Sequence, residues 1–188
     1  MTNLERLEAR GYTVRLEVEW LALEPAFTRA VRHVLELEGG YGQPPNDPGG
    51  ETHYGISHRA YPWITIKALN RHEAISIYHR DYWLAMGCEL LPSALGAKLL
   101  DVGVNVGHRA GIRLLQQGLC YLGRHLGQAV AVDGRMGPET IAAVAAVGEA
   151  RARQALTTYQ LRHYVTLVEK RPEIYGPSAA GWLARAFS

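Results

Sequence analysis

The stretch LELEGGYGQPPNDPGGETHYGIS, residues 35–57, decides the fold because a helix ends inside it and a glycine- and proline-rich segment follows at once. Upstream of it, apolar residues recur at the period of one helix face: Phe27, Val31, Val34 and Leu35. Glu38 falls on the same face, whereas Glu36 points away from it. Gly39 and Gly40 then end the helix. The pattern predicts a carboxyl group on the core-facing side of the last helical turn.

Two features of this position favour the protonated form of the Glu38 carboxyl. Desolvation on an apolar face disfavours the charged form. The negative end of the helix dipole opposes a second negative charge there by ~0.3–1 kcal/mol. Cleavage of a glycosidic bond needs such a protonated acid beside the leaving oxygen. A glutamate beside two glycines at a helix end is, in isolation, more often a capping or solvated residue, so the position alone leaves both interpretations open.

The segment 42–55 is predicted to be a loop or a short hairpin that folds back over the helix end. It carries Asp47 and Thr52, either of which can handle a water molecule or stabilise an oxocarbenium-like transition state. Tyr41 and Tyr54 flank it and can stack on pyranose faces. The structural alternatives are equally simple, because an aspartate before a proline is a common turn former and a threonine often caps the next segment.

Most of the remaining chain shows helical periodicity, so the predicted class is mainly α with one small β region. The helical segments are 71–85, 95–106, 112–119, 140–170 and the closing GWLARAF, residues 181–187. One segment differs. Residues 12–20, YTVRLEVEW, alternate apolar and polar side chains, which predicts a strand with one buried face.

Composition narrows the function classes without selecting one. The chain has 188 residues, 47% hydrophobic and 20% charged, and a net charge of +2. No dense Lys/Arg run indicates a nucleic-acid partner, and no apolar run reaches the ~20 residues that would allow stable membrane insertion. The first residues, MTNLERLEARGY, lack a signal-peptide core, so synthesis in the cytoplasm is expected.

No histidine pair has a metal-binding spacing, which argues against a zinc amidase or peptidase. The two cysteines, Cys88 and Cys120, match no metal or redox spacing.

Several motifs together resemble a known family. They are EGGYGQPPNDPGGETHYGIS, IYHRDYW, LLDVGVNVG, LQQGL, DGRMGPET and the terminal GW with Arg185, in this order along the chain. They resemble glycoside hydrolase family 108, the bacterial and phage N-acetylmuramidases, joined to a predicted peptidoglycan-binding segment. The resemblance implies a lysozyme-like α+β fold. It divides the chain into an N-terminal extension (1–26) with the strand, a catalytic segment (27–120) and a helical peptidoglycan-binding segment (121–188).

The resemblance also implies roles for single residues. The glutamate of the family's E-G-G-Y motif falls on Glu38, as general acid. The order Glu38, Asp47, Thr52 resembles the Glu–Asp–Thr arrangement of phage-type lysozymes, in which the last two position water. Asn105 either hydrogen-bonds an N-acetyl group or satisfies a nearby loop. Trp182 and Arg185 are read as anchors of the C-terminus rather than as sugar ligands.

The expected function is that of a lysozyme-type muramidase that cleaves the MurNAc–GlcNAc β-1,4 bond of peptidoglycan glycan strands, with no cofactor and no metal. It would act on the cell wall after release or dedicated export. Two alternatives stay open. Where the family commonly has a further Asp-Pro, this sequence has Pro44, which favours a non-catalytic peptidoglycan-binding module. A lytic transglycosylase would use one glutamate and no water.

Overall fold

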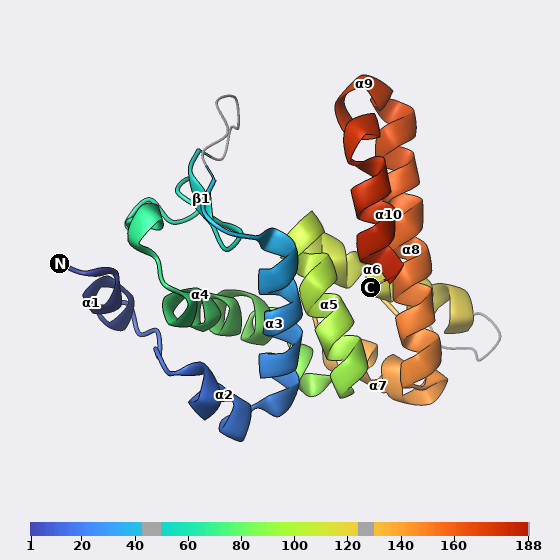
Figure 1. Ribbon diagram of the computed structural model, residues 1–188. Coiled ribbons are helices and arrows are strands. Elements are labelled where there is room, and N and C mark those ends of the chain that lie inside the picture. Colours follow the sequence, from blue (N-terminus) through green and yellow to red (C-terminus); the bar gives the residue numbers. More distant parts are fainter. Residues whose placement is uncertain (43–49, 124–129, 188) are drawn as a thin grey trace. The chain divides into compact units, whose positions relative to one another are not determined.

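The computed structural model describes residues 1–42, 50–123 and 130–187. Its chain divides into two compact units, Met1–Ala85 and Met86–Ser188. Helices dominate both, and in the described residues the β structure amounts to one two-stranded antiparallel sheet and an isolated bridge between Gly42 and Thr52. The expected mainly α, lysozyme-like class with a small β region is confirmed (Figure 1). The three-part division at 26/27 and 120/121 stays a prediction.

The first unit is built around helix α3. Its elements are α1 (Asn3–Glu8), α2 (Glu17–Leu23), α3 (Pro25–Glu38), β1 (Thr52–His53), β2 (Ile56–Ser57), the 3-10 helix η1 (Ile66–Ala68), α4 (Arg71–Tyr78) and the π-helical turn η2 (His79–Leu84). The apolar face of α3 is buried as its period predicts, with Phe27, Val31 and Val34 fully enclosed. Proline occupies the first position of α3, where a missing N–H costs no hydrogen bond.

The strand predicted over residues 12–20 is wrong, because α2 begins at Glu17. The carboxylate of Glu19 accepts the backbone N–H of Leu16 at 2.7 Å, which caps the new helix. Of the alternating apolar set, Tyr12 and Trp20 are buried, but Leu16 and Val18 are 55% and 70% exposed. A strand that buried one face would have had to cover all of these side chains.

The first 24 residues are tied to the rest of their unit by side-chain contacts. Tyr12 Oη donates to Asp81 Oδ2 at 2.6 Å. The Glu17 carboxylate accepts from Arg71 at 2.8 Å and also pairs with Arg32. Trp20 packs edge-on against Phe27, with 5.6 Å between ring centroids. These contacts make the N-terminal segment an integral layer of the first unit.

In the described residues of the second unit, all regular elements are helices. Its elements are η3 (Cys88–Leu90), α5 (Ser93–Val106), α6 (His108–Gly123), α7 (Pro138–Val147), α8 (Glu149–Lys170), α9 (Pro172–Tyr175), η4 (Gly176–Ser178) and α10 (Ala179–Phe187). The long helix α8 packs against α5, α6, α7 and α10, and Figure 1 shows α10 running alongside it. At the crossing of α6 and α8, a Cβ on Gly118 would lie 2.8 Å from Ala155 Cβ, so glycine permits the close approach.

The end of the chain is anchored as the sequence indicates. Arg185 Nε donates to Asp101 Oδ1 at 2.7 Å, and both side chains are largely buried. The indole of Trp182 stacks on Tyr164, with 5.1 Å between ring centroids. In the described part of the chain, every helix is too short or too polar to cross a bilayer.

Candidate active site

Glu38 is the last residue of α3 and is half-buried. Gly39 follows with φ of +73°, a conformation that glycine adopts without strain, and its N–H donates to the carbonyl of Leu35 at 3.3 Å. The helix therefore stops directly after the carboxylate. Because Val34 and Leu35 on the same face are buried, the predicted place of Glu38 at the core-facing end of the helix is confirmed.

A β-hairpin turn lies against the Glu38 side chain. Strands β1 and β2 pair antiparallel through Thr52 with Ser57 and His53 with Ile56. The two turn residues, Tyr54 and Gly55, both have positive φ, +52° and +74°. Such values are typical of the tight turns whose twist matches the flanking strands.

The contact between this turn and the carboxylate leaves no room for a side chain. A Cβ on Gly55 would lie 2.8 Å from Glu38 Cγ and 3.0 Å from Glu38 Oε2. It would also lie 2.6 Å from the hydroxyl oxygen of Tyr78. Main chain thus covers one side of the glutamate, and water is excluded there.

A buried tyrosine fixes the turn in this position. Tyr78, at the end of α4 and fully enclosed, donates its hydroxyl to the carbonyl of Tyr54 at 2.8 Å. Its ring packs against Tyr82 at 5.1 Å between centroids. Burial raises the pKa of Tyr82, and the negative charges of Asp81 and Glu38 add to the effect. Tyr82 therefore stays a hydroxyl donor within the electrostatic reach of Glu38.

Three aromatic side chains lie together at the hairpin. His53 stacks on Tyr54, with ring centroids 4.1 Å apart and planes 11° apart. Tyr41 meets His53 edge-on at 6.0 Å and donates its hydroxyl to Glu51 at 3.0 Å. The Nδ1 atom of His53 lies 3.3 Å from the carbonyl oxygen of Ile66. Tyr41, His53 and Tyr54 thus form a row of rings of the kind that packs on the apolar faces of sugars.

The predicted site residues fall into three groups. Glu38, Thr52 and the two tyrosines belong to the helix end and the hairpin segment, and Thr52 exchanges both backbone hydrogen bonds with Gly42, at 2.8 and 2.9 Å. Asp47, like Pro44, lies outside the described residues. Asn105 belongs to the second unit.

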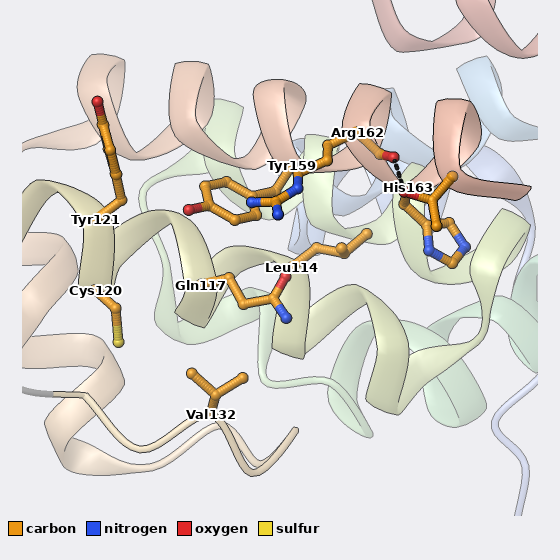
Figure 2. A pocket seen from close by; sticks show the side chains of 9 residues that line it. Leu114, Gln117, Cys120, Tyr121, Val132, Tyr159, Arg162 and His163 are labelled. Atoms are coloured by element: carbon orange, nitrogen blue, oxygen red, sulfur yellow. Dashed lines mark hydrogen bonds between the residues drawn. The ribbon is translucent and has the colours of Figure 1, made fainter. Parts of the chain in front are cut away.

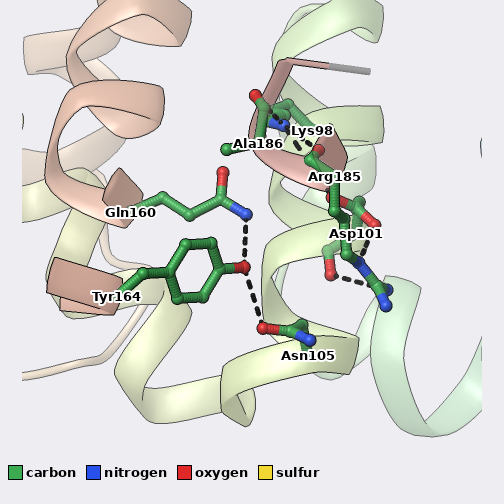
Figure 3. Close-up of polar contacts among 7 residues, drawn as sticks. All are labelled: Lys98, Asp101, Asn105, Gln160, Tyr164, Arg185 and Ala186. Carbon is green, nitrogen blue, oxygen red and sulfur yellow. Dashed lines mark hydrogen bonds and ion pairs between the residues drawn. The ribbon is translucent and has the colours of Figure 1, made fainter. Parts of the chain in front are cut away.

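Asn105 takes part in a chain of polar contacts inside that unit. Figure 3 shows Gln160 Nε2 donating to the Tyr164 hydroxyl, which in turn donates to Asn105 Oδ1, both at 2.8 Å. The amide oxygen of Asn105 therefore satisfies Tyr164. Its predicted role toward an N-acetyl group stays a prediction.

Three contributors to this site escaped the sequence analysis. In the sequence, Tyr78 lies in a helical segment, Gly55 carries only a turn signal, and His53 belongs to no pair with a metal-binding spacing. The adjacency of His53 to Tyr54 was the available hint, since rings on neighbouring residues of a tight hairpin can stack. Within the described ranges, no group of three His, Cys, Asp or Glu residues could hold a metal ion.

A half-buried carboxyl group beside a row of aromatic rings can act as a proton donor. Its side chain is held from one side by main chain, so its position is set before a substrate arrives. The acid is offered at the end of a helix, next to a segment that can contact pyranose rings. This arrangement suits acid-assisted cleavage of a glycosidic bond.

Two family models match the chain in succession. Residues 31–107 match Glycosyl hydrolase 108, and residues 110–187 match Predicted Peptidoglycan domain. Among solved structures, that of Brucella abortus SagA is similar, with a TM-score of 0.67 and 26% identity over 87% of this chain and 95% of the SagA chain. No curated protein matches the chain. The resemblance drawn from the motifs is confirmed.

Proposed function

We propose that this chain, which joins a Glycosyl hydrolase 108 segment to a Predicted Peptidoglycan domain, is an N-acetylmuramidase that uses Glu38 as its general acid. The two matches support a glycoside hydrolase directed at peptidoglycan. The identity of the cleaved bond and the role of Glu38 as the general acid are the parts that we propose. The target is the β-1,4 bond from N-acetylmuramic acid to N-acetylglucosamine.

The observation that carries the proposal is the contact between Glu38 and the turn at Gly55. An added methyl group on Gly55 would lie 2.8 Å from Glu38 Cγ and 3.0 Å from its carboxylate atom Oε2. Neighbouring peptide groups replace water on that side and hold the carboxyl group in place. Glu36, two residues earlier and exposed, has no such cover.

The reaction needs one proton donor and one water molecule. As the bond between C1 of N-acetylmuramic acid and the glycosidic oxygen breaks, the oxygen takes the Glu38 proton and leaves as the 4-hydroxyl of N-acetylglucosamine. Water adds its hydroxide to C1 and gives its proton to a base, which produces a new reducing end. We assign Asp47 as that base and the Thr52 hydroxyl as the group that orients the water. Tyr41 and Tyr54 pack on the sugars beside the bond. The assignment of Asp47 rests on its place in the motif.

Substitution of Glu38 by glutamine tests the proposal. Glu38→Gln keeps the shape of the side chain and removes its proton, so clearing of a purified peptidoglycan suspension should slow by about 10²–10⁴-fold. Glu36→Gln is the matched control, two residues earlier on the exposed side of the same helix, and should clear at the wild-type rate. Equal thermal unfolding of both variants shows that the fold is intact.

Analysis of the products by mass spectrometry separates the remaining possibilities. A muramidase releases fragments that end in reducing N-acetylmuramic acid. Anhydro-sugar ends would identify a lytic transglycosylase, and reducing N-acetylglucosamine ends would identify cleavage of the other bond. Sedimentation with the wall without clearing would identify a binding module. Clearing by Glu38→Gln at more than a tenth of the wild-type rate would remove Glu38 from the mechanism.

A further inference from the structure

The second unit carries a groove between α6 and α8 that the reaction does not use. Its volume is about 440 Å³, within the range of sites that hold small ligands. Figure 2 shows side chains from both helices facing into it. Helix α6 supplies Leu114, Gln117 and Tyr121, and α8 supplies Tyr159, Arg162 and His163.

The groove has a positive charge with no counter-charge in its wall. None of the described residues that line it is acidic. The guanidinium carbon of Arg162 lies over the ring of Tyr159, 5.9 Å from its centroid, which restrains an otherwise mobile side chain. Burial lowers the pKa of His163, so its imidazole is neutral at neutral pH. Arg162 therefore supplies the fixed charge of the groove.

The remaining wall offers neutral hydrogen-bonding groups and exposed ring surface. Gln117 presents an amide, and Tyr121 is 61% exposed. Leu114 at the base is buried and apolar. A ligand that fits this wall carries a carboxylate, polar amide groups and short aliphatic side chains.

We propose that this groove binds the peptide stem of peptidoglycan, with a stem carboxylate paired to Arg162. The choice between the two components of the polymer follows from charge. The alternating sugars of the glycan are neutral where the lactyl group bears a peptide, whereas the stem bears free carboxylates and alternates amides with methyl groups. The inference rests on the peptidoglycan target proposed above. It gives the C-terminal segment a task of its own, which is to hold the cross-linking peptides while the first unit works on the glycan.

Binding of a soluble stem pentapeptide to the full chain tests the inference. All proteins carry Glu38→Gln, and the peptide contains no glycosidic bond, so the measurement does not depend on catalysis. Arg162→Gln should raise the Kd measured by NMR titration by about 10–100-fold, the value of one hydrogen bond to a charged group. Arg151→Gln is the matched control, since Arg151 is an exposed arginine of the same helix that does not line the groove. It should leave the Kd within about twofold, a change below 0.5 kcal/mol.

Neutral β-1,4-linked N-acetylglucosamine oligosaccharides, which carry no carboxylate, provide the second arm as the glycan probe. They should bind equally to the parent and to Arg162→Gln. If the pentapeptide does not bind, or if Arg162→Gln binds it as tightly as Arg151→Gln does, the inference is wrong. A loss of glycan binding in Arg162→Gln would assign the groove to sugar instead and would also overturn it. Each of these outcomes is independent of wall clearing, which tests the muramidase proposal alone.

Discussion

Replacement of Gly55 by alanine tests whether the hairpin turn sets the position of Glu38. Alanine at φ of +74° costs about 1–2 kcal/mol for its backbone conformation alone. The new methyl group would also lie 2.6 Å from the Tyr78 hydroxyl and 2.8 Å from Glu38 Cγ, so the turn must move away. That movement breaks the hydrogen bond from Tyr78 to Tyr54, which adds about 1 kcal/mol.

The control for this variant is Gly11→Ala. Gly11 belongs to the same unit, has φ of +78°, and has nothing within 4 Å of an added Cβ, so alanine there measures the backbone cost alone. At about 2–4 °C for each kcal/mol, Gly11→Ala should lower Tm by about 2–8 °C and Gly55→Ala by about 4–12 °C.

Activity separates the two variants more sharply than stability does. A displacement of the acid by about 1 Å costs on the order of 10²-fold in rate. Clearing of purified peptidoglycan, measured well below both Tm values, should therefore fall about that much in Gly55→Ala and stay near wild type in Gly11→Ala. Equal losses of Tm and of activity in the two variants would refute the idea that the turn positions Glu38.

Two further expectations concern the same unit. Tyr78→Phe removes the donor to the Tyr54 carbonyl, so it should cost about 1 kcal/mol in denaturant unfolding and lower kcat/KM on peptidoglycan; an unchanged kcat/KM would contradict the positioning role. The hydrogen bond from Arg71 lowers the pKa of Glu17 in the folded chain below its ordinary 4.5. The ionised Glu17 therefore stabilises the fold fully above pH 4.5, and this stabilisation is lost as the pH falls through the lowered pKa of the folded chain. The Tm difference between wild type and Glu17→Gln should thus be present at about pH 7 and shrink towards about pH 3, and a difference that stays constant with pH would contradict it.

The helix that carries Glu38 could be predicted from sequence because its evidence is local. Four apolar residues at helical spacing and a pair of glycines fix its face and its end, and the same signals place Glu38 at the tip. The segment 42–55 is predicted to be a loop or a short hairpin because it is rich in glycine and proline, and the structure has a hairpin turn at its end, between β1 and β2.

The strand expected at residues 12–20 failed because alternation is an ambiguous signal in a short segment. The burial of Tyr12 and Trp20 is compatible both with a strand and with the observed coil followed by a helix, because the two residues are far enough apart to be buried separately. The helix is stabilised by one local interaction, the cap that Glu19 provides, and by interactions with distant residues. The arginines that hold Glu17 lie 15 and 54 residues further along the chain.

The candidate site shows the same limit. No periodicity in sequence links Tyr78 to the carbonyl of Tyr54, which lies 24 residues earlier. The need for glycine at position 55 likewise comes from atoms of Glu38 and Tyr78, and only the folded chain brings these to it. Sequence places Glu38 at the helix tip, whereas tertiary contacts show what holds its side chain there.

The N-terminal layer has a practical consequence for anyone who excises the hydrolase. A fragment trimmed to the family match at residue 31 would discard Trp20 and Phe27, and with them the aromatic partners of His79. It would strip Asp81 of its Tyr12 donor and leave Arg71 without Glu17. A fragment for transfer into another protein should therefore keep residues 1–30 rather than start at the family boundary, because these residues pack as a layer of the first unit.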